Sequence, residues 1–231
     1  MKILRKFIDL LTQFLGRLKR NRRLSVNQRS ITKVNLGAGL AVAPGWVNID
    51  GSLNSLVANL PKLFHIAAYY FSGARNFYTK EQYCEILQEN KFIHHDIRFG
   101  VPFHNATLDY IFSSHFLEHL YLKDAKQLIN DCYRSLKVGG RIRISVPDLE
   151  HAFNLYKNGE GEKMLSSYFF IDDDSFFAQH KYMYDYEILS SILRQAGFIN
   201  INKSTYQHGD FPDVKLLDNR KEESLFIEAS K

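Results

Sequence analysis

Hydrophobic and polar positions along the chain alternate between short apolar runs and longer segments with helical periodicity. From residue 32 onward the two kinds of segment follow one another, an order that predicts a largely parallel sheet. The expected strands are Lys33–Leu36, Trp46–Ile49, Phe92–Asp96, Tyr110–Ser114, Arg141–Val146, Ile199–Thr205 and Leu225–Ala229. The expected helices are Glu81–Asn90, Lys123–Leu136 and Tyr186–Ala196.

The first 24 residues have a helical pattern of their own, in which apolar side chains recur at spacings of three and four. They would share one face of a helix, and they are Leu4, Phe7, Ile8, Leu11, Phe14, Leu15 and Leu18. Asp9 and Gln13 interrupt the apolar run, so neither a secretory signal nor a membrane-spanning helix is expected. We therefore expect residues 1–29 to form a basic amphipathic helix and linker, and residues 30–231 to form the main domain.

Charge is distributed unevenly between these two parts. The chain has a net charge of +5, but residues 1–33 carry a net charge of +9 and the remainder a net charge of −4. The basic helix could pack on the domain, pack on a second subunit, or lie on an anionic membrane. The mildly acidic body is a poor surface for nucleic-acid phosphates. The two cysteines, Cys84 and Cys132, have neither disulfide nor ligand spacing, which is typical of a reducing, cytoplasmic compartment.

A glycine turn and a carboxylate follow the first two expected strands. Gly37 and Gly39 come directly after the first strand, and Asp50 ends the second. Glycine lets the backbone approach a ligand closely, and an acid in this position can accept hydrogen bonds from ribose hydroxyls. A dinucleotide loop needs a third glycine where Val42 stands, and Pro44 occupies the start of its helix. The pattern therefore favours a nucleoside site that is not a site for NAD(P).

Further segments continue this pattern along the chain. Together with the first two they are Val34–Gly39, Gly45–Asp50, His95–Ile97, Leu108–Leu120, Leu136–Asp148, His180–Asp185 and Glu223–Ala229. In order and spacing they resemble the class I S-adenosylmethionine-dependent methyltransferases, and most of all a bacterial branch of small predicted methyltransferases associated with surface-polysaccharide synthesis. The resemblance covers residues 32–231. It implies a Rossmann-like, seven-stranded, mostly parallel sheet with helices on both faces, and transfer of a methyl group to a hydroxyl of a sugar or glycan precursor.

The resemblance also implies S-adenosylmethionine as cofactor, and with it a set of binding residues. The glycine loop would pass the methionine and ribose, Asp50 would hold the ribose hydroxyls, and the third and fourth strands would contact adenine and the sulfonium. The implied residues are Asn35, Gly37, Gly39, Asp50, Asp96, Ile97, Ser114 and His115. Two positions depart from the family pattern: Asn35 replaces a common acid, and Ala41 replaces a third glycine.

A hydroxyl acceptor must also lose a proton, which requires a base with a pKa near neutrality. The histidines near the expected crevice are His115, His119, His151 and His180. We take His115, His180 and Asp148 as the catalytic candidates, although each could instead serve in packing or capping. His115 and His119 enclose Glu118 at a spacing that also suits zinc. That motif should lie within a helix rather than close a strand, so no metal is expected.

Other features of the chain leave its role partly open. The segment Leu149–Met183 leaves the fifth strand at the edge where sites lie in open sheets, so we expect it to act as a lid, with Asp172–Asp174 in a solvated loop. Alternatives to the enzyme are a catalytically inactive methyltransferase-like protein that binds a partner, and an RNA methyltransferase that uses the basic N-terminus. The acceptor, the base and the oligomeric state are not specified by the sequence.

Overall fold

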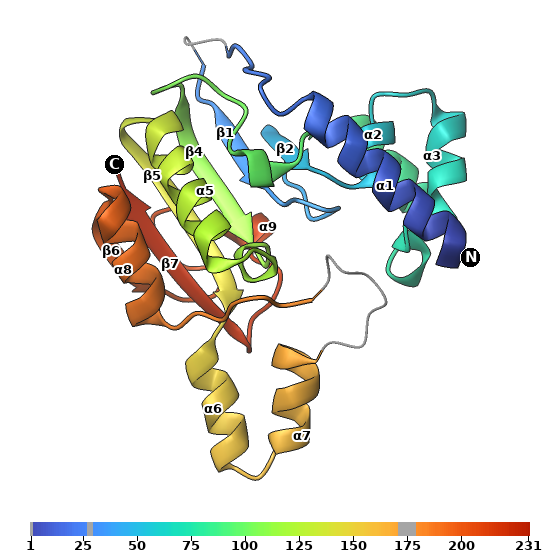
Figure 1. Cartoon of the computed structure of the whole chain (residues 1–231). Helices are drawn as coiled ribbons and strands as arrows, with labels where there is room; N and C mark the ends of the chain where they lie inside the picture. Colours follow the sequence, from blue (N-terminus) through green and yellow to red (C-terminus); the bar gives the residue numbers. More distant parts are fainter. Residues whose placement is uncertain (1, 27–29, 171–178) are drawn as a thin grey trace.

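The fold is organised around one twisted sheet with strand order β3-β2-β1-β4-β5-β7-β6 (Figure 1). The computed structural model describes residues 2–26, 30–170 and 179–231, without the side chains of residues 2–7 and 9; Asp172–Asp174 therefore lie outside the described residues. The strands are β1 (Lys33–Leu36), β2 (Trp46–Asp50), β3 (Lys91–His94), β4 (Leu108–Ser114), β5 (Leu136–Pro147), β6 (Ile199–Ser204) and β7 (Ser224–Ser230). β7 runs antiparallel to both of its neighbours. The predicted Rossmann-like, mostly parallel seven-stranded sheet is confirmed.

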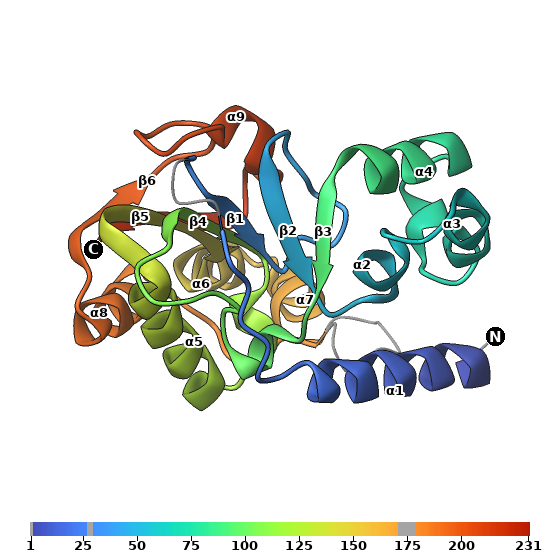
Figure 2. The same cartoon turned by 90° about the horizontal axis from the view of Figure 1, so that it is seen from above.

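Helices cover both faces of the sheet and extend beyond one edge (Figure 2). They are α1 (Lys2–Leu18), α2 (Leu53–Val57), α3 (Lys62–Tyr69), α4 (Lys80–Glu89), α5 (Leu122–Ser135), α6 (Leu149–Lys157), α7 (Gly161–Met164), α8 (Tyr186–Ala196) and α9 (Val214–Leu217). α5 and α8 lie on one face, α9 lies on the other, and α2 to α4 lie beyond the edge strand β3. The predicted bounds of α4, α5 and α8 agree with the structure to within one residue.

Three strand boundaries differ from the prediction by two residues or more. β4 begins at Leu108, two residues before the predicted Tyr110. β5 begins at Leu136, which pairs with Leu108 of β4. The next pair is Tyr110 with Arg141, so the register shifts between the two pairs, and the glycines at 139 and 140 lie in the extra length of β5. β3 ends at His94, two residues early. The chain turns there into the short 3₁₀ helix η2 (Ile97–Phe99), whose first turn is capped by the Asp96 carboxylate.

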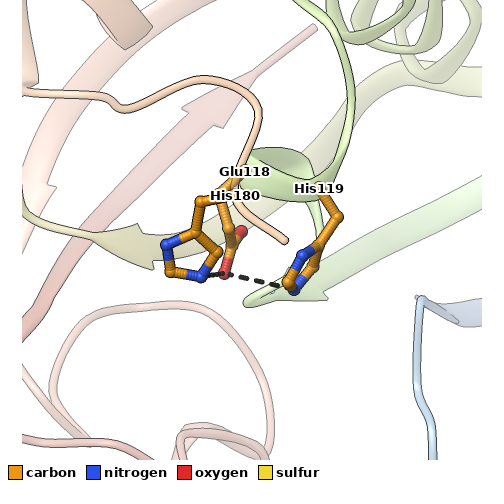
Figure 3. Close-up of side chains that lie close together, drawn as sticks. All are labelled: Glu118, His119 and His180. Atoms are coloured by element: carbon orange, nitrogen blue, oxygen red, sulfur yellow. Dashed lines mark ion pairs between the residues drawn. The ribbon is translucent and has the colours of Figure 1, made fainter. Parts of the chain in front are cut away.

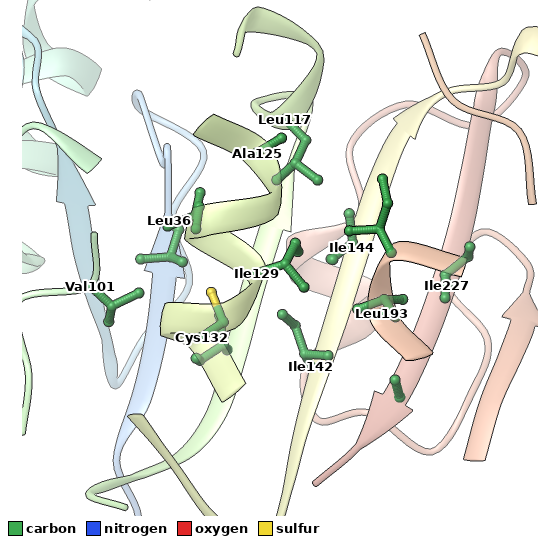
Figure 4. Packing of buried hydrophobic residues seen from close by; sticks show 14 of the residues in the cluster. Leu36, Val101, Leu117, Ala125, Ile129, Cys132, Ile142, Ile144, Leu193 and Ile227 are labelled. Atoms are coloured by element: carbon green, nitrogen blue, oxygen red, sulfur yellow. The ribbon is translucent and has the colours of Figure 1, made fainter. Parts of the chain in front are cut away.

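The main core lies between the sheet and the helices α5 and α8 (Figure 4). Ile142 and Ile144 of β5 belong to the same buried cluster as Ile129 of α5 and Leu193 of α8. In β5 these isoleucines alternate with Arg141 and Arg143, so the apolar side chains of the strand face this core. Both cysteines are buried and free, in agreement with the expected absence of a disulfide framework.

The opposite face of the sheet holds a buried arginine. The Arg143 guanidinium of β5 is bidentate to Asp218, with Nε at 3.0 Å and Nη2 at 2.5 Å, and its Nη1 lies 2.5 Å from Glu228 Oε1. It also donates to the backbone carbonyls of Thr205 and His208. These bonds fasten the segment between β6 and β7 onto the sheet.

The N-terminal helix α1 packs on the domain with an unexpected face. Thr12 and Gly16 are buried, and a Cβ added to Gly16 would lie 2.9 Å from Asp96 Cβ. Part of the predicted apolar face points away instead: Leu11, Phe14 and Leu18 are 41%, 59% and 67% exposed, whereas Ile8 and Leu15 are half-buried. Gly16 has no side chain and therefore permits the close approach. Around the helix axis it lies about a third of a turn away from the predicted apolar face. No helix among the described residues is both long and apolar enough to cross a bilayer.

The segment after α1 is held against the domain. Leu24 forms an isolated bridge with Phe103, and its backbone N–H donates to the Pro102 carbonyl at 2.8 Å. Leu24 and Val26 also pack against the main core. The polar stretch that we predicted to be a linker is therefore anchored at these two apolar residues.

The contact between α1 and β3 should make stability depend on pH. Lys19 Nζ lies 3.3 Å from His94 Nδ1, and burial, together with the charge of Lys19, lowers the pKa of His94 from 6.5 to about 4. Between these two values the unfolded chain binds more protons than the folded one, so stability falls as the pH falls. When the pH is lowered from about 7.5 to about 5, the protonation of this residue in the unfolded chain should reduce the free energy of unfolding by about 2 kcal/mol.

Urea unfolding at the two pH values, for the unchanged protein and for His94→Gln, would measure this contribution. We expect the loss of unfolding free energy to be larger in the unchanged protein by about 2 kcal/mol. Equal losses in the two proteins would show that His94 is not the group responsible.

Candidate functional site

A cavity of about 480 Å³ opens at the carboxyl ends of β1 to β4, the edge where open α/β sheets bind their ligands. Its volume suits a small molecule or cofactor. α1 borders it through Ile8, Thr12 and Gln13. The residues of the predicted site that line it are Gly37, Asp50, Asp96, Ile97 and His115. Four separate sequence segments predicted to share a site thus meet at one cavity.

Asp50 and the glycine loop hold one another in place. Asp50 Oδ2 accepts from the Gly39 N–H at 3.0 Å, and Oδ1 accepts from the Ser52 N–H at 2.7 Å. Gly37 has φ +70°, and a Cβ there would lie 2.5 Å from the Phe116 ring. No side chain could replace glycine at that position without displacing Phe116. Each Asp50 oxygen keeps a second lone pair that could accept a ligand hydroxyl.

Three of the predicted cofactor-binding residues, Asn35, Gly39 and Ser114, are not among those that line the cavity. Asn35 Nδ2 donates to the Ala41 carbonyl at 2.8 Å and lies 3.2 Å from Asn48 Oδ1, so its amide holds the glycine loop. Ser114 Oγ lies 3.1 Å from Ser145 Oγ, on the neighbouring strand. Direct contacts of Asn35 and Ser114 with a cofactor stay predictions.

Asp96 is bound by a neighbour that the sequence analysis did not single out. Its carboxylate accepts from Arg98 Nε at 2.9 Å, from Nη2 at 2.6 Å and from the Arg98 backbone N–H at 3.1 Å. This hydrogen bonding raises the pKa of Arg98. A ligand amino group would have to share a carboxylate that is already paired, so the adenine contact of Asp96 stays a prediction.

Three histidines surround Glu118 beside the cavity, and Figure 3 shows two of them, His119 and His180. Glu118 lies in the 3₁₀ helix η3 (Leu117–His119), directly after β4, and is 0% exposed. Its Oε1 lies 3.4 Å from His115 Nδ1, 3.9 Å from His119 Nε2 and 4.0 Å from His180 Nε2. The sequence pointed to these histidines as candidates, but it gave no indication that Glu118 lies at their centre.

Opposing influences act on the pKa values within this cluster. Burial raises the pKa of Glu118, but the close approach of the His115 imidazole and positive charge on His115 and His119 outweigh it, so the net shift is downward. Burial lowers the pKa of His180, although Glu118 opposes that shift. The net shift favours the ionised form of the Glu118 carboxylate.

His180 reaches this cluster from the far end of the expected lid. α6 and α7 project from the carboxyl edge of the sheet (Figure 1), and the chain returns so that the Lys181 N–H donates to the Glu118 carbonyl at 2.7 Å. His180 does not line the cavity, although its ring centroid lies 5.2 Å from that of His119. The sequence offered no signal for this contact, because the residues are about 60 positions apart.

Asp148 and His151 lie away from the cavity. Asp148 caps α6 by accepting from the Glu150 N–H at 3.0 Å, the structural role that the sequence left open for it. The His151 ring lies 6.2 Å from that of Tyr168. Neither residue is among those that line the cavity, and a catalytic role for Asp148 stays a prediction.

Comparison with known proteins agrees with this arrangement. Residues 64–144 match a family model described as a methyltransferase domain. The S-adenosylmethionine-dependent methyltransferase SibL, in its apo form, superposes with a TM-score of 0.51 at 15% identity, over 88% of this chain and 51% of SibL. No curated protein sequence matches the chain. The superposition supports the fold, and the family match supports a methyltransferase domain.

Two further solved structures are similar but score lower. A proposed O-methyltransferase from Nostoc punctiforme has a TM-score of 0.49 and 14% identity, over 99% of this chain and 57% of that protein. A methyltransferase from Archaeoglobus fulgidus, described as dependent on S-adenosylmethionine, has a TM-score of 0.47 and 16% identity, over 98% of this chain and 94% of that protein. The chain thus spans little more than half the length of the Nostoc protein and of SibL.

Proposed function

We propose that this chain, which carries a methyltransferase domain with S-adenosylmethionine as its cofactor, transfers the methyl group to a hydroxyl of a sugar or glycan precursor. One observation carries the proposal. A single cavity brings the Asp50 carboxylate and the Gly37 loop at one end of the crevice together with the imidazoles of His115 and His119.

The residues at the cavity fit this cofactor. Gly37 lines the cavity, and a Cβ added to the neighbouring Gly39 would meet no atom within 4 Å, so the loop leaves its backbone accessible on that side. Asp50 offers two carboxylate oxygens, as the ribose hydroxyls require. When bound, S-adenosylmethionine supplies a methyl group on a positively charged sulfur.

The chain's own contribution is to position the acceptor and to remove a proton. An in-line displacement gains much of its rate from correct placement of the acceptor behind the methyl group. A hydroxyl acceptor must lose its proton, and imidazole is the side chain best suited to accept it near neutral pH. His115 and His119 line the cavity and are the nearest such groups. The sugar or glycan class of the acceptor rests on the resemblance of residues 32–231.

Label transfer tests the proposed function. The full chain would be incubated with S-adenosylmethionine labelled at the methyl group, together with a panel of nucleotide sugars and oligosaccharides, and separately with RNA. We expect label in the carbohydrate fraction. Label in RNA alone would contradict the proposed acceptor. Binding of S-adenosylmethionine to the folded chain would be measured by isothermal titration calorimetry. If no binding were detected, the proposal that the chain is a methyltransferase would be contradicted.

We also propose that α1 rests on an anionic membrane surface. Its packed face covers the cavity, while Leu11, Phe14 and Leu18 face outward. Exposed basic residues follow directly at the end of the helix: Arg17, Arg20, Arg22 and Arg23. An exposed apolar stripe beside a basic cluster is the pattern of helices that lie at the interface of anionic bilayers.

Flotation with vesicles tests this surface. We expect the full chain to float with vesicles that contain anionic phosphatidylglycerol, and the triple variant Leu11→Ser, Phe14→Ser, Leu18→Ser to lose most of that binding. Leu216→Ser, which changes an exposed leucine of α9, is the matched control and should float normally. Equal flotation of the triple variant, or a dimer that the same substitutions dissociate without lipid, would contradict the proposal.

A further inference from the structure

A fully buried carboxylate lies at the centre of the histidine cluster without a hydrogen-bond donor. Glu118 is 0% exposed, and neither of its oxygens has a hydrogen-bond partner among the described residues. Burying an ionised carboxylate without donors is costly, unless a positive charge compensates it. The arrangement therefore requires a positive charge close to Glu118, which either a protonated ring of the cluster or a bound cation would supply.

The hydrogen bonds at the outer nitrogens of two histidines fix which nitrogen faces Glu118. His119 Nδ1 lies 3.3 Å from the Gln179 carbonyl oxygen, and His180 Nδ1 lies 2.8 Å from the Tyr168 carbonyl oxygen. Because a carbonyl only accepts, each Nδ1 carries the hydrogen. In the neutral ring, Nε2 then points a lone pair towards the carboxylate, 3.9 Å away for His119 and 4.0 Å away for His180 (Figure 3).

Lone pairs that converge on a carboxylate are the donor set of a metal site. Metal-bound histidines almost always donate their other ring nitrogen to a carbonyl or carboxylate, which orients the ring. Both Nδ1 bonds described above have this form. The three side chains come from two segments, η3 and the stretch after α7, so the cluster is built by the tertiary fold rather than by one helix.

We propose that Glu118, His119 and His180 bind a divalent transition-metal ion of the zinc type. Their ligand atoms all lie within 4.8 Å of one another, and small side-chain rotations would bring them to the spacing of about 3.4 Å expected around a tetrahedral zinc ion. Two imidazoles and one carboxylate favour zinc and its neighbours over Mg²⁺ and Ca²⁺, which prefer oxygen ligands. Three protein ligands leave a fourth position open.

His115 is the positioning residue of this site. Its Nε2 lies 2.8 Å from Ser224 Oγ, and its Nδ1 lies 3.4 Å from Glu118 Oε1. When the Ser224 hydroxyl donates to Nε2, the hydrogen of the neutral ring sits on Nδ1 and faces the carboxylate. His115 then steadies Glu118 while the other two rings bind the ion.

His119 lines the cavity, so an ion held by it would lie beside the cavity wall. Resting on the proposed function, the ion would bind the acceptor oxygen and make its proton easier to remove. With the ion bound, His119 is a ligand and His115 is engaged by Ser224 and Glu118, so neither ring acts as the base, and the hydroxyl proton passes to water as the new bond from oxygen to the methyl carbon forms. The bond from sulfur to that carbon breaks, and its electron pair stays on sulfur. The class of acceptor is therefore an alcohol that can reach an ion beside His119.

Metal binding by the full chain tests the site directly. The protein would be freed of metal with a chelator and titrated with Zn²⁺ and, separately, with Co²⁺; bound metal would be counted by mass spectrometry and the visible cobalt spectrum recorded. We expect one equivalent per chain, and at least about 100-fold weaker binding in Glu118→Gln and in His180→Gln. His151→Gln, which changes a histidine outside the cluster, is the matched control.

The outcomes separate this site from the proposed function. Binding of S-adenosylhomocysteine to the metal-free protein, measured by calorimetry, reports the cofactor site alone and confirms that each variant is folded. Metal binding that Glu118→Gln and His180→Gln leave unchanged, or none in the unchanged protein, would overturn the metal site and leave the cofactor site standing. Metal binding without S-adenosylhomocysteine binding would overturn the proposed function and leave the metal site standing.

Discussion

Replacing Asp50 with alanine is expected to weaken the binding of S-adenosylhomocysteine by about 100-fold. The carboxylate offers lone pairs for two ribose hydroxyls, and hydrogen bonds to a charged group contribute about 1.5–3 kcal/mol each. The substitution also removes the acceptor that holds the Gly39 and Ser52 N–H groups, so the glycine loop loses its anchor. Isothermal titration calorimetry on both proteins would measure the change in dissociation constant.

The matched control for this prediction is Asp185→Asn. Asp185 caps α8 through the Ile188 N–H at 2.7 Å and does not line the cavity. Asparagine caps a helix about as well as aspartate, so both affinity and stability should stay unchanged. An Asp50→Ala protein that is folded and binds as tightly as the unchanged chain would show that the cavity is not the ribose site.

Replacing Arg143 with methionine is expected to lower the free energy of unfolding by about 3–5 kcal/mol. The substitution leaves the Asp218 and Glu228 carboxylates buried without their main partner. It also removes one of the two donors to each of the Thr205 and His208 carbonyls, so the segment on that face of the sheet should loosen. Urea unfolding at neutral pH would measure the loss.

Arg141→Met is the control on the same strand. Arg141 also pairs with Glu228, at 3.0 Å, but its side chain is partly exposed. Exposed ion pairs contribute about 0–1 kcal/mol, so this loss should be small. Losses of similar size in the two variants would contradict the view that burial makes Arg143 the more important partner.

The sheet could be predicted because its strands carry local signals. β1 and β2 are short, mostly apolar segments that are each followed by glycine, and the paired glycines at 139 and 140 precede the main part of β5. β3 was overextended because Phe92–Asp96 looks uniformly extended, whereas the Asp96 side chain turns the chain into η2. The local sequence pattern does not show that the Asp96 side chain will cap the helix that follows it.

The cavity residues at the ends of strands could also be predicted. Gly37, Asp50 and His115 follow or end their strands, and parallel strands bring such positions to one edge. The ion pair of Asp96 with Arg98 and the hydrogen bonds of Asn35 to the loop could not be predicted. Both depend on which way a side chain turns once its neighbours are in place.

The two features missed most clearly are tertiary. The periodicity of α1 predicted an apolar face but not which face meets the domain. The contact at Gly16 is decided by how closely two surfaces can approach. The cluster around Glu118 joins η3 to His180 across the expected lid. A motif search within one segment could find His115 and His119, but not the third ring.

A crystal structure of the full chain with S-adenosylhomocysteine tests the central claim most directly. We predict the ribose hydroxyls at Asp50, the adenine beside Ile97 and the sulfur towards His115, with α1 covering the ligand. Density for the ligand outside this cavity, or a ribose that does not contact Asp50, would contradict the assignment of this site.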